Sequence, residues 1–179
     1  SDAVRANDSE RDYPRAIRLL REAVALDSNF AEAWRKLSVS IRNQGGYAPS
    51  VGDSAIRRAF ALRERMTERE RDAVLGYYYQ QNPGYDRQKA IDAYERMLAR
   101  GDSTVALVNA GVQYLQRRQY AKAESLFRAS AKLQPGNQTS VNNLINALRD
   151  QGRYATADSV IAGARKSFPG ATTFNQLSV

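Results

Sequence analysis

Amide side chains recur at a fixed distance along this sequence, and amides are suited to holding another polypeptide. Asn109 and Asn143 lie 34 residues apart, and Asn146 follows Asn143 at helical spacing. An asparagine side chain both donates and accepts hydrogen bonds, so a row of them can hold the main chain of an extended peptide without reading its sequence. The alternative is that these asparagines are solvated on an exposed helix face.

Two further groups could contact a partner. Arg35, Lys36 and Arg42 would form a basic entrance suited to a carboxylate or an acidic segment. The alternative is an ordinary solvated basic face. In the run "GYYYQQ", Tyr77 is predicted to face the same surface while Tyr79 enters the core. Tyrosine is a frequent interface anchor, although packing of Tyr77 between neighbouring helices is an equal alternative.

The composition argues against catalysis. The 179 residues include neither histidine nor cysteine, which removes the commonest general base, the commonest metal ligand and all thiolate chemistry. No glycine-rich phosphate loop, metal-ligand set or nucleophile–base pair is visible. We therefore expect no enzyme activity and no cofactor. No apolar run reaches the length of a membrane span, so we expect no membrane contact by this segment. The net charge of +8 makes an acidic partner one option.

A longer pattern begins at a small residue that recurs along the chain. A bulky residue follows four positions later, and a second residue, small or bulky, three positions after that. A residue that ends the helix follows after another five positions. The pattern repeats every 33 to 34 residues in the second half of the chain. A period of this length is typical of helical repeats. Its clearest copies are Ala16-Leu20-Ala23-Ser28, Ala90-Tyr94-Met97-Asp102, Ala123-Phe127-Ser130-Pro135 and Ala157-Ile161-Ala164-Pro169.

The intervals predict pairs of antiparallel helices. Spacings of 4 and 3 place residues on one helix face, alanine permits close approach of two helices, and a terminal proline ends the helix. A second apolar set lies upstream of each anchor beyond a short turn, which makes the two helices neighbours. No segment has the period of a strand. The predicted helices are 13–27, 31–43, 54–65, 68–81, 86–100, 103–117, 120–133, 138–151 and 154–168.

The pattern resembles the tetratricopeptide repeat (TPR) family. The resemblance rests on Trp34 with Leu37, on Leu75-Gly76 with Tyr79, on Gly111 with Tyr114, and on the run Ala123, Phe127 and Pro135. It covers nearly the whole chain and implies an all-α, right-handed superhelical solenoid of antiparallel helix pairs, about nine helices in a single domain. The repeats would span 13–28 (second helix only), 31–67, 68–102, 103–135 and 136–169, with a further helix starting at 170–179.

The sequence departs from a regular array in the second repeat. The residues "YAPSVGDS" at 47–54 are extra, and we expect them to form a loop. This repeat also lacks a terminal proline. Thr67 instead precedes Glu70 by three residues, which predicts a capping box that starts the next helix.

In the TPR family the first helix of each pair lines a concave groove, and this implies a set of partner-binding positions. Val74 would also face the groove. Because Val39 and Val74 stand where a carboxylate clamp would need asparagines, that clamp is not expected. The candidate groove residues are Arg35, Lys36, Arg42, Tyr77, Asn109, Gln116, Asn142, Asn143, Asn146 and Arg149.

The context of the chain can be inferred only by resemblance. Residues 61–98 are similar to the TPR region that follows the catalytic domain in many bacterial serine/threonine kinases. This implies a sensory or scaffolding segment of a bacterial signalling protein, on either side of a membrane. The helix at 13–27 has no predicted partner before it, so we expect a piece of a longer polypeptide. Ile17, Leu20 and Phe174 would then be covered by another chain or left open.

A protein-interaction scaffold that binds a protein or peptide is therefore the leading hypothesis. Binding of single-stranded nucleic acid is an alternative, because helical repeats of this length can each read one base and the chain is basic. Nucleic acid is the less favoured partner, since the aromatic residues occupy core positions rather than a stacking row. Self-assembly through uncapped ends, giving a homo-oligomer, is compatible with the leading hypothesis.

Overall fold

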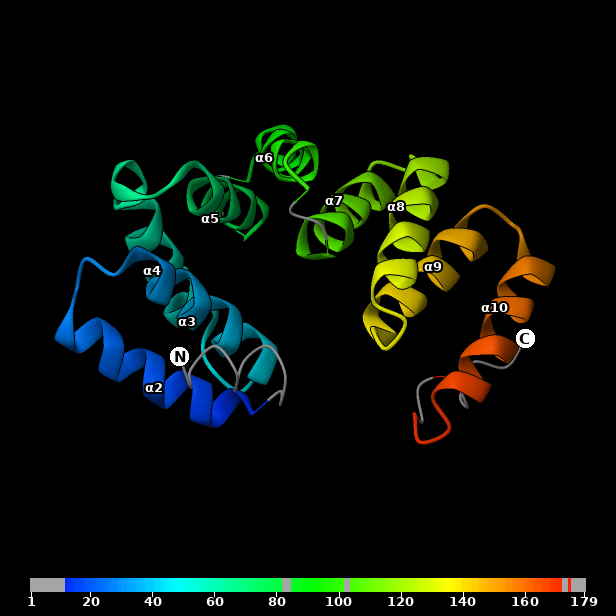
Figure 1. Cartoon of the computed structure of the whole chain (residues 1–179), viewed down its shortest axis with the longest axis horizontal. Helices are drawn as coiled ribbons and strands as arrows, with labels where there is room; N and C mark the ends of the chain where they lie inside the picture. Colours follow the sequence, from blue (N-terminus) through cyan, green and yellow to red (C-terminus); the bar gives the residue numbers. More distant parts are fainter. Residues whose placement is uncertain (1–11, 82–84, 102–103, 172–173, 175–179) are drawn as a thin grey trace. The chain divides into compact units, whose positions relative to one another are not determined.

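The computed structural model describes residues 12–81, 85–101, 104–171 and 174, and the regular elements in these residues are all helical (Figure 1). The predicted all-α class is therefore confirmed. The helices are α2 (Tyr13–Leu26), α3 (Ala31–Gln44), α4 (Pro49–Ala61), the short 3-10 helix η1 (Arg63–Arg65), α5 (Glu68–Gln81), α6 (Arg87–Ala99), α7 (Thr104–Gln116), α8 (Tyr120–Leu133), α9 (Gln138–Asp150) and α10 (Tyr154–Ser167).

The chain forms two compact units, Ser1–Ala93 and Tyr94–Val179. In the first unit α3 packs against both α2 and α4, and α5 packs against α4 (Figure 1). Ile17 and Leu20 of α2 are almost fully buried in one cluster with Leu37 and Ile41 of α3. The expectation that Ile17 and Leu20 need cover from another chain is therefore wrong, because α3 provides that cover.

In the second unit α8 packs between α7 and α9, and α10 packs on α9 (Figure 1). The predicted anchors Ala123 and Ala157 are completely buried, as is the ring of Phe127. Phe174 is also fully buried, and its ring stacks on Phe168 at a centroid distance of 5.4 Å. The expectation of an uncovered Phe174 is wrong as well.

The repeat is visible in backbone geometry within the second unit. The turn after α7 closes with the amide of Gln119 donating to the carbonyl of Tyr114 at 3.0 Å. The turn after α9 closes in the same way, from Arg153 to Leu148 at 2.9 Å. The second pair follows the first by 34 positions in the sequence. Each turn also contains one residue with positive φ, which is Arg118 in the first turn and Gly152 in the second. The two hairpins thus end in the same backbone conformation, as the repeated pattern predicts.

The largest error in the predicted boundaries lies at α4. The sequence pattern predicts a loop at 47–54, yet the helix begins at Pro49 and ends at Ala61. Proline is favoured in the first turn of a helix because the N–H that it lacks would have no intrahelical partner there. The capping box is confirmed: the amide of Thr67 donates to the Glu70 carboxylate at 3.0 Å, and the amide of Glu70 donates to the Thr67 hydroxyl at 3.3 Å.

Candidate functional site

Helices α7 and α9 are neighbours in the second unit and carry most of the candidate amides. Asn109 lies on α7, and Asn142 and Asn143 lie on α9; all three side chains are half-buried. Asn146 is exposed one turn further along α9. None of these four amides forms a side-chain hydrogen bond with another residue in the described part of the chain. Their donors and acceptors are thus available to a bound polypeptide.

Two more candidates continue these faces at helical spacing. Gln116 follows Asn109 by seven residues and lies at the end of α7. Arg149 follows Asn142 by seven residues and is half-buried on α9. The opposite face of α9 carries the fully buried Leu148. The polar candidates and the core therefore divide α9 as an amphipathic helix requires.

The position of α9 is fixed at both of its ends. Asn137 caps the first turn by accepting a hydrogen bond from the amide of Ser140 at 3.2 Å. The Ser140 hydroxyl, which is fully buried, lies 2.7 Å from that of Ser130 on α8. At the other end, Gln151 donates to the Glu124 carboxylate of α8 at 2.9 Å. These contacts hold the helix that carries three of the four asparagines against its neighbour.

Glu124 is the centre of that second contact. Its carboxylate is almost fully buried and accepts hydrogen bonds from Arg128 at 2.9 Å, from Arg153 at 2.6 Å and from Gln151. Burial alone would raise the pKa of Glu124. The hydrogen bonds from Gln151 and Arg128 and the positive charge of Arg153 outweigh burial, so the pKa lies below its ordinary value near 4.5.

We expect Glu124→Gln to lower the free energy of unfolding by about 1 kcal/mol at pH 7. The figure is modest because the two arginine side chains are nearly half exposed and solvent screens their charges. The lowered pKa of Glu124 contributes stability above pH 4.5 that is lost as the pH falls through the native-state pKa. Urea unfolding at several pH values should therefore show the difference from wild type shrinking below pH 4.5. A difference that is constant down to about pH 3 would contradict this account.

In the first unit, the two arginines of the predicted basic entrance are already paired with carboxylates. Nε and Nη2 of Arg35 donate to the Glu32 carboxylate, at 2.7 and 2.5 Å. Arg42 of α3 forms an ion pair with Asp53 of α4. The sequence does not predict this second pair, because its pattern puts Asp53 in a loop. Lys36 is half-buried beside them on α3. These arginines therefore offer less charge to a ligand than expected.

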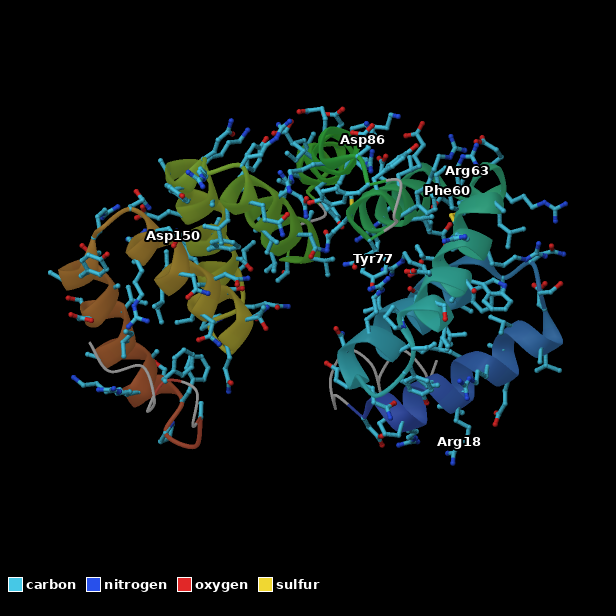
Figure 2. The ribbon with its side chains drawn as sticks, turned by 180° about the vertical axis from the view of Figure 1, so that it is seen from behind. Arg18, Phe60, Arg63, Tyr77, Asp86 and Asp150 are labelled. Atoms are coloured by element: carbon cyan, nitrogen blue, oxygen red, sulfur yellow. The ribbon has the colours of Figure 1, made fainter. Side chains whose placement is uncertain are left out.

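Tyr77 of α5, labelled in Figure 2, lies near Arg42 and Arg35, whose charges act on its hydroxyl. Burial raises the pKa of its hydroxyl, while Arg42, a hydrogen bond with the Ser38 side chain and Arg35 act in the opposite direction. Since the pKa is raised overall, the phenol remains neutral at physiological pH. Tyr77, Arg42 and Arg35 thus lie close enough together to interact. Val74 does not join them, because this side chain is completely buried among Ile56 and other core residues.

Sequence reasoning missed how closely α3 and α4 approach each other beside this group. Ser38, fully buried, donates to the carbonyl of Gly52 at 2.7 Å. A Cβ atom at Gly52 would lie 3.4 Å from Cγ and Nε of Arg42, so the arginine stem lies directly over the glycine. The glycine in the middle of α4 is the signal that could have indicated this contact. The close approach of α3 and α4 at Gly52 places Asp53 beside Arg42, with which it forms an ion pair.

The described residues contain no cluster of acidic side chains that could hold a metal ion. None of the described helices is long and apolar enough to cross a membrane.

The sequence of α7 to α10 can be compared with known families. Residues 108–172 match the family model of the tetratricopeptide repeat. This part of the chain is therefore similar in sequence to tetratricopeptide repeats. The resemblance inferred from Gly111, Tyr114, Ala123 and Phe127 is therefore confirmed for this part of the chain. None of the curated proteins matches the sequence.

Solved structures extend the TPR-like fold to the remaining helices. A crystal structure of MamA has a TM-score of 0.56 and 20% identity, covering 99% of this chain and 94% of its own. MamA from Desulfovibrio magneticus RS-1 has a TM-score of 0.55 and 17% identity, covering 93% and 88%. YrrB, described as a TPR protein with an unusual peptide-binding site, has a TM-score of 0.54 and 18% identity, covering 93% and 83%. The chain has the helical solenoid fold of these proteins.

Proposed function

We propose that this chain is a non-catalytic scaffold that binds a protein or peptide, and that the face formed by α7 and α9 holds an extended peptide. The observation that carries the proposal is the set of amides on these two adjacent helices. Asn109, Asn142 and Asn143 are half-buried, and none of them forms a hydrogen bond through its side chain with another described residue. Half-buried amides lose part of their hydration, so a peptide main chain that pairs with them gains more than it would at a fully exposed amide.

The similarity to YrrB supports this proposal, since that TPR protein is described as having a peptide-binding site. In the first unit, Arg35, Arg42 and Tyr77 are a second contact region of the same scaffold. Tyr77 supplies a large, partly buried ring and a neutral hydroxyl, which suits an interface anchor. That the scaffold is a segment of a bacterial signalling protein rests only on the resemblance of residues 61–98 to kinase-attached repeats.

The test is a peptide selection followed by titration. Peptides are selected from a random library on the wild-type protein and then titrated by isothermal calorimetry against Asn109→Ala/Asn143→Ala. Each lost hydrogen bond to a bound main chain costs about 1 kcal/mol, so we expect the double variant to bind the selected peptides roughly tenfold or more weakly. Peptides N-methylated on their main chain should lose affinity for the wild type by a similar factor.

The matched control is Asn29→Ala, which removes an exposed amide from the turn between α2 and α3. It should leave every affinity unchanged. If the double variant binds all selected peptides as tightly as the wild type, the α7–α9 face is not the binding site. The same experiment with Tyr77→Ala shows whether the first unit contributes.

A further inference from the structure

The first unit contains a cleft between α2 and α4 that the proposed peptide site does not use. Its volume is about 420 Å³, within the range of known ligand-binding pockets. Helix α3 forms the floor of the cleft, because α2 and α4 both pack on α3. The apolar side chains that line it are Val24, Trp34, Leu37, Ile41, Val51 and Ala55.

The cleft exists because the side chains of α4 at this position are small. Ser50 and Ser54 line the cleft, and the Ser54 hydroxyl turns back to donate to the carbonyl of Ser50 at 2.8 Å. These serines present little bulk, so a hollow remains between the two helices. Of the α3 side chains that line it, Leu37 and Ile41 are almost fully buried and Trp34 is half-buried. Val51, which is more than a third exposed, adds an apolar side chain at the edge. Such a surface is suited to apolar side chains of a partner.

Two arginines accompany the cleft. Arg21 lines it, with its guanidinium 5.6 Å from the ring centre of Tyr47. Arg58 lies next to the lining residue Trp34: its guanidinium and the indole of Trp34 donate to the same carbonyl of Ser28, at 3.4 and 3.0 Å. Neither arginine forms an ion pair with a carboxylate in the described part of the chain. Helices α2 and α4 together carry five arginines and two carboxylates, and one of these two is Asp53, already paired with Arg42.

We propose that this cleft is a separate docking site, distinct from both contact regions described above, which binds an acidic amphipathic helix of another protein. The apolar cleft would receive side chains at i, i+3, i+4 and i+7 of the partner helix, and carboxylates flanking them would pair with Arg21 and Arg58. The 13 residues of α4 extend over about 20 Å. A partner helix of three to four turns matches that length.

The sequence supplies a specific probe of this site, since Trp34 is its only tryptophan and lines the cleft. Intrinsic fluorescence therefore reports occupancy directly. The test uses synthetic helical peptides of about 14 residues with leucines at amphipathic spacing. One peptide carries glutamate on its flanks, a second carries lysine, and a third has the acidic composition in scrambled order. We expect only the ordered acidic peptide to change the emission of Trp34 in a saturable way.

Two variants test the residues, each with a matched control. Arg21→Glu should weaken binding of the acidic peptide at least about tenfold, whereas Arg18→Glu makes the same charge change on α2 at an exposed residue that does not line the cleft. Arg18 lies one helical turn from Arg21, so Arg18→Glu should weaken binding clearly less than Arg21→Glu, because it changes the charge near the cleft without removing a side chain that lines it. Ser54→Phe should fill the cleft and abolish the response. Ser159→Phe is its control, because Ser159 is an exposed serine of α10 whose hydroxyl likewise donates to the carbonyl four residues earlier.

Several outcomes would overturn the proposal. One is an unchanged Trp34 emission with the acidic peptide, and another is equal binding of the acidic and lysine-flanked peptides. A third is a spectral change that depends on protein concentration without peptide and disappears in Ser54→Phe, which would assign the cleft to a second copy of the chain. Asn109→Ala/Asn143→Ala should leave the Trp34 response intact, so failure of this site is distinguishable from failure of the α7–α9 site.

Discussion

Phe127→Ala should lower the free energy of unfolding by about 3–5 kcal/mol, a large fraction of the stability of an ordinary folded domain. The ring of Phe127 is completely buried in the second unit. Truncating a buried phenylalanine removes its burial energy and leaves a cavity that the surrounding helices fill only in part. Urea unfolding followed by far-ultraviolet circular dichroism would measure the loss.

Phe30→Ala is the matched control. Phe30 is about half exposed next to the start of α3, and its truncation should change the free energy of unfolding by less than about 0.5 kcal/mol. Equal losses in the two variants would show that the ring of Phe127 does not have the packing role assigned to it.

Gly111→Ala should destabilise the protein although alanine favours helix formation. A Cβ atom at Gly111 would lie 2.5 Å from Cε1 of Phe127 and 2.9 Å from two further ring atoms. The ring is completely buried, and overpacking of this kind costs about 1–3 kcal/mol. Replacing a helical glycine by alanine stabilises the helix by about 1 kcal/mol, which offsets part of this cost. We expect a net loss of up to about 2 kcal/mol in urea unfolding.

Gly163→Ala provides the contrast. Gly163 lies in α10, is exposed, and has no atom within 4 Å of the position of a Cβ. Here only the helix propensity changes, so the variant should be about 1 kcal/mol more stable than the wild type. Gly111→Ala should be partly rescued by Phe127→Leu, because the smaller side chain makes room for the methyl group. A stabilising effect of Gly111→Ala would contradict the close approach of α7 and α8.

The hairpins of the second unit could be predicted because one physical requirement repeats there. Each pair of helices needs a small residue where the helices cross and a large one beyond it, and Ala123 with Phe127 and Ala157 with Ile161 meet this need. The spacing of these residues fixes which face is buried. The boundaries of α8 and α10 therefore differ from the prediction by at most one residue.

The prediction is wrong where a residue is buried for a reason other than this spacing. The repeat pattern describes only one buried face of α5, and Val74 lies outside that face, so the pattern predicts Val74 on the groove. In the structure Val74 belongs to a second buried cluster, together with Ile56 and Met66. The start of α4 is missed because an apparent insertion contains Pro49 in a position that favours a helix start. The pairing of Arg42 with Asp53 is missed for the same reason, since it depends on a helix at residue 53.

The capping box at Thr67 also determines where this chain could accept foreign sequence. Only Met66 and Thr67 separate η1 from α5; Met66 is buried, and Thr67 is engaged with Glu70. Because both residues of this connection are engaged, an insertion here would displace both η1 and α5. The connection between α3 and α4 is different, since Gly45 and Gly46 both have positive φ and have no atoms near the positions of their Cβ atoms. A reporter or an extra module spliced into the chain therefore belongs at 45–46 rather than at 66–67.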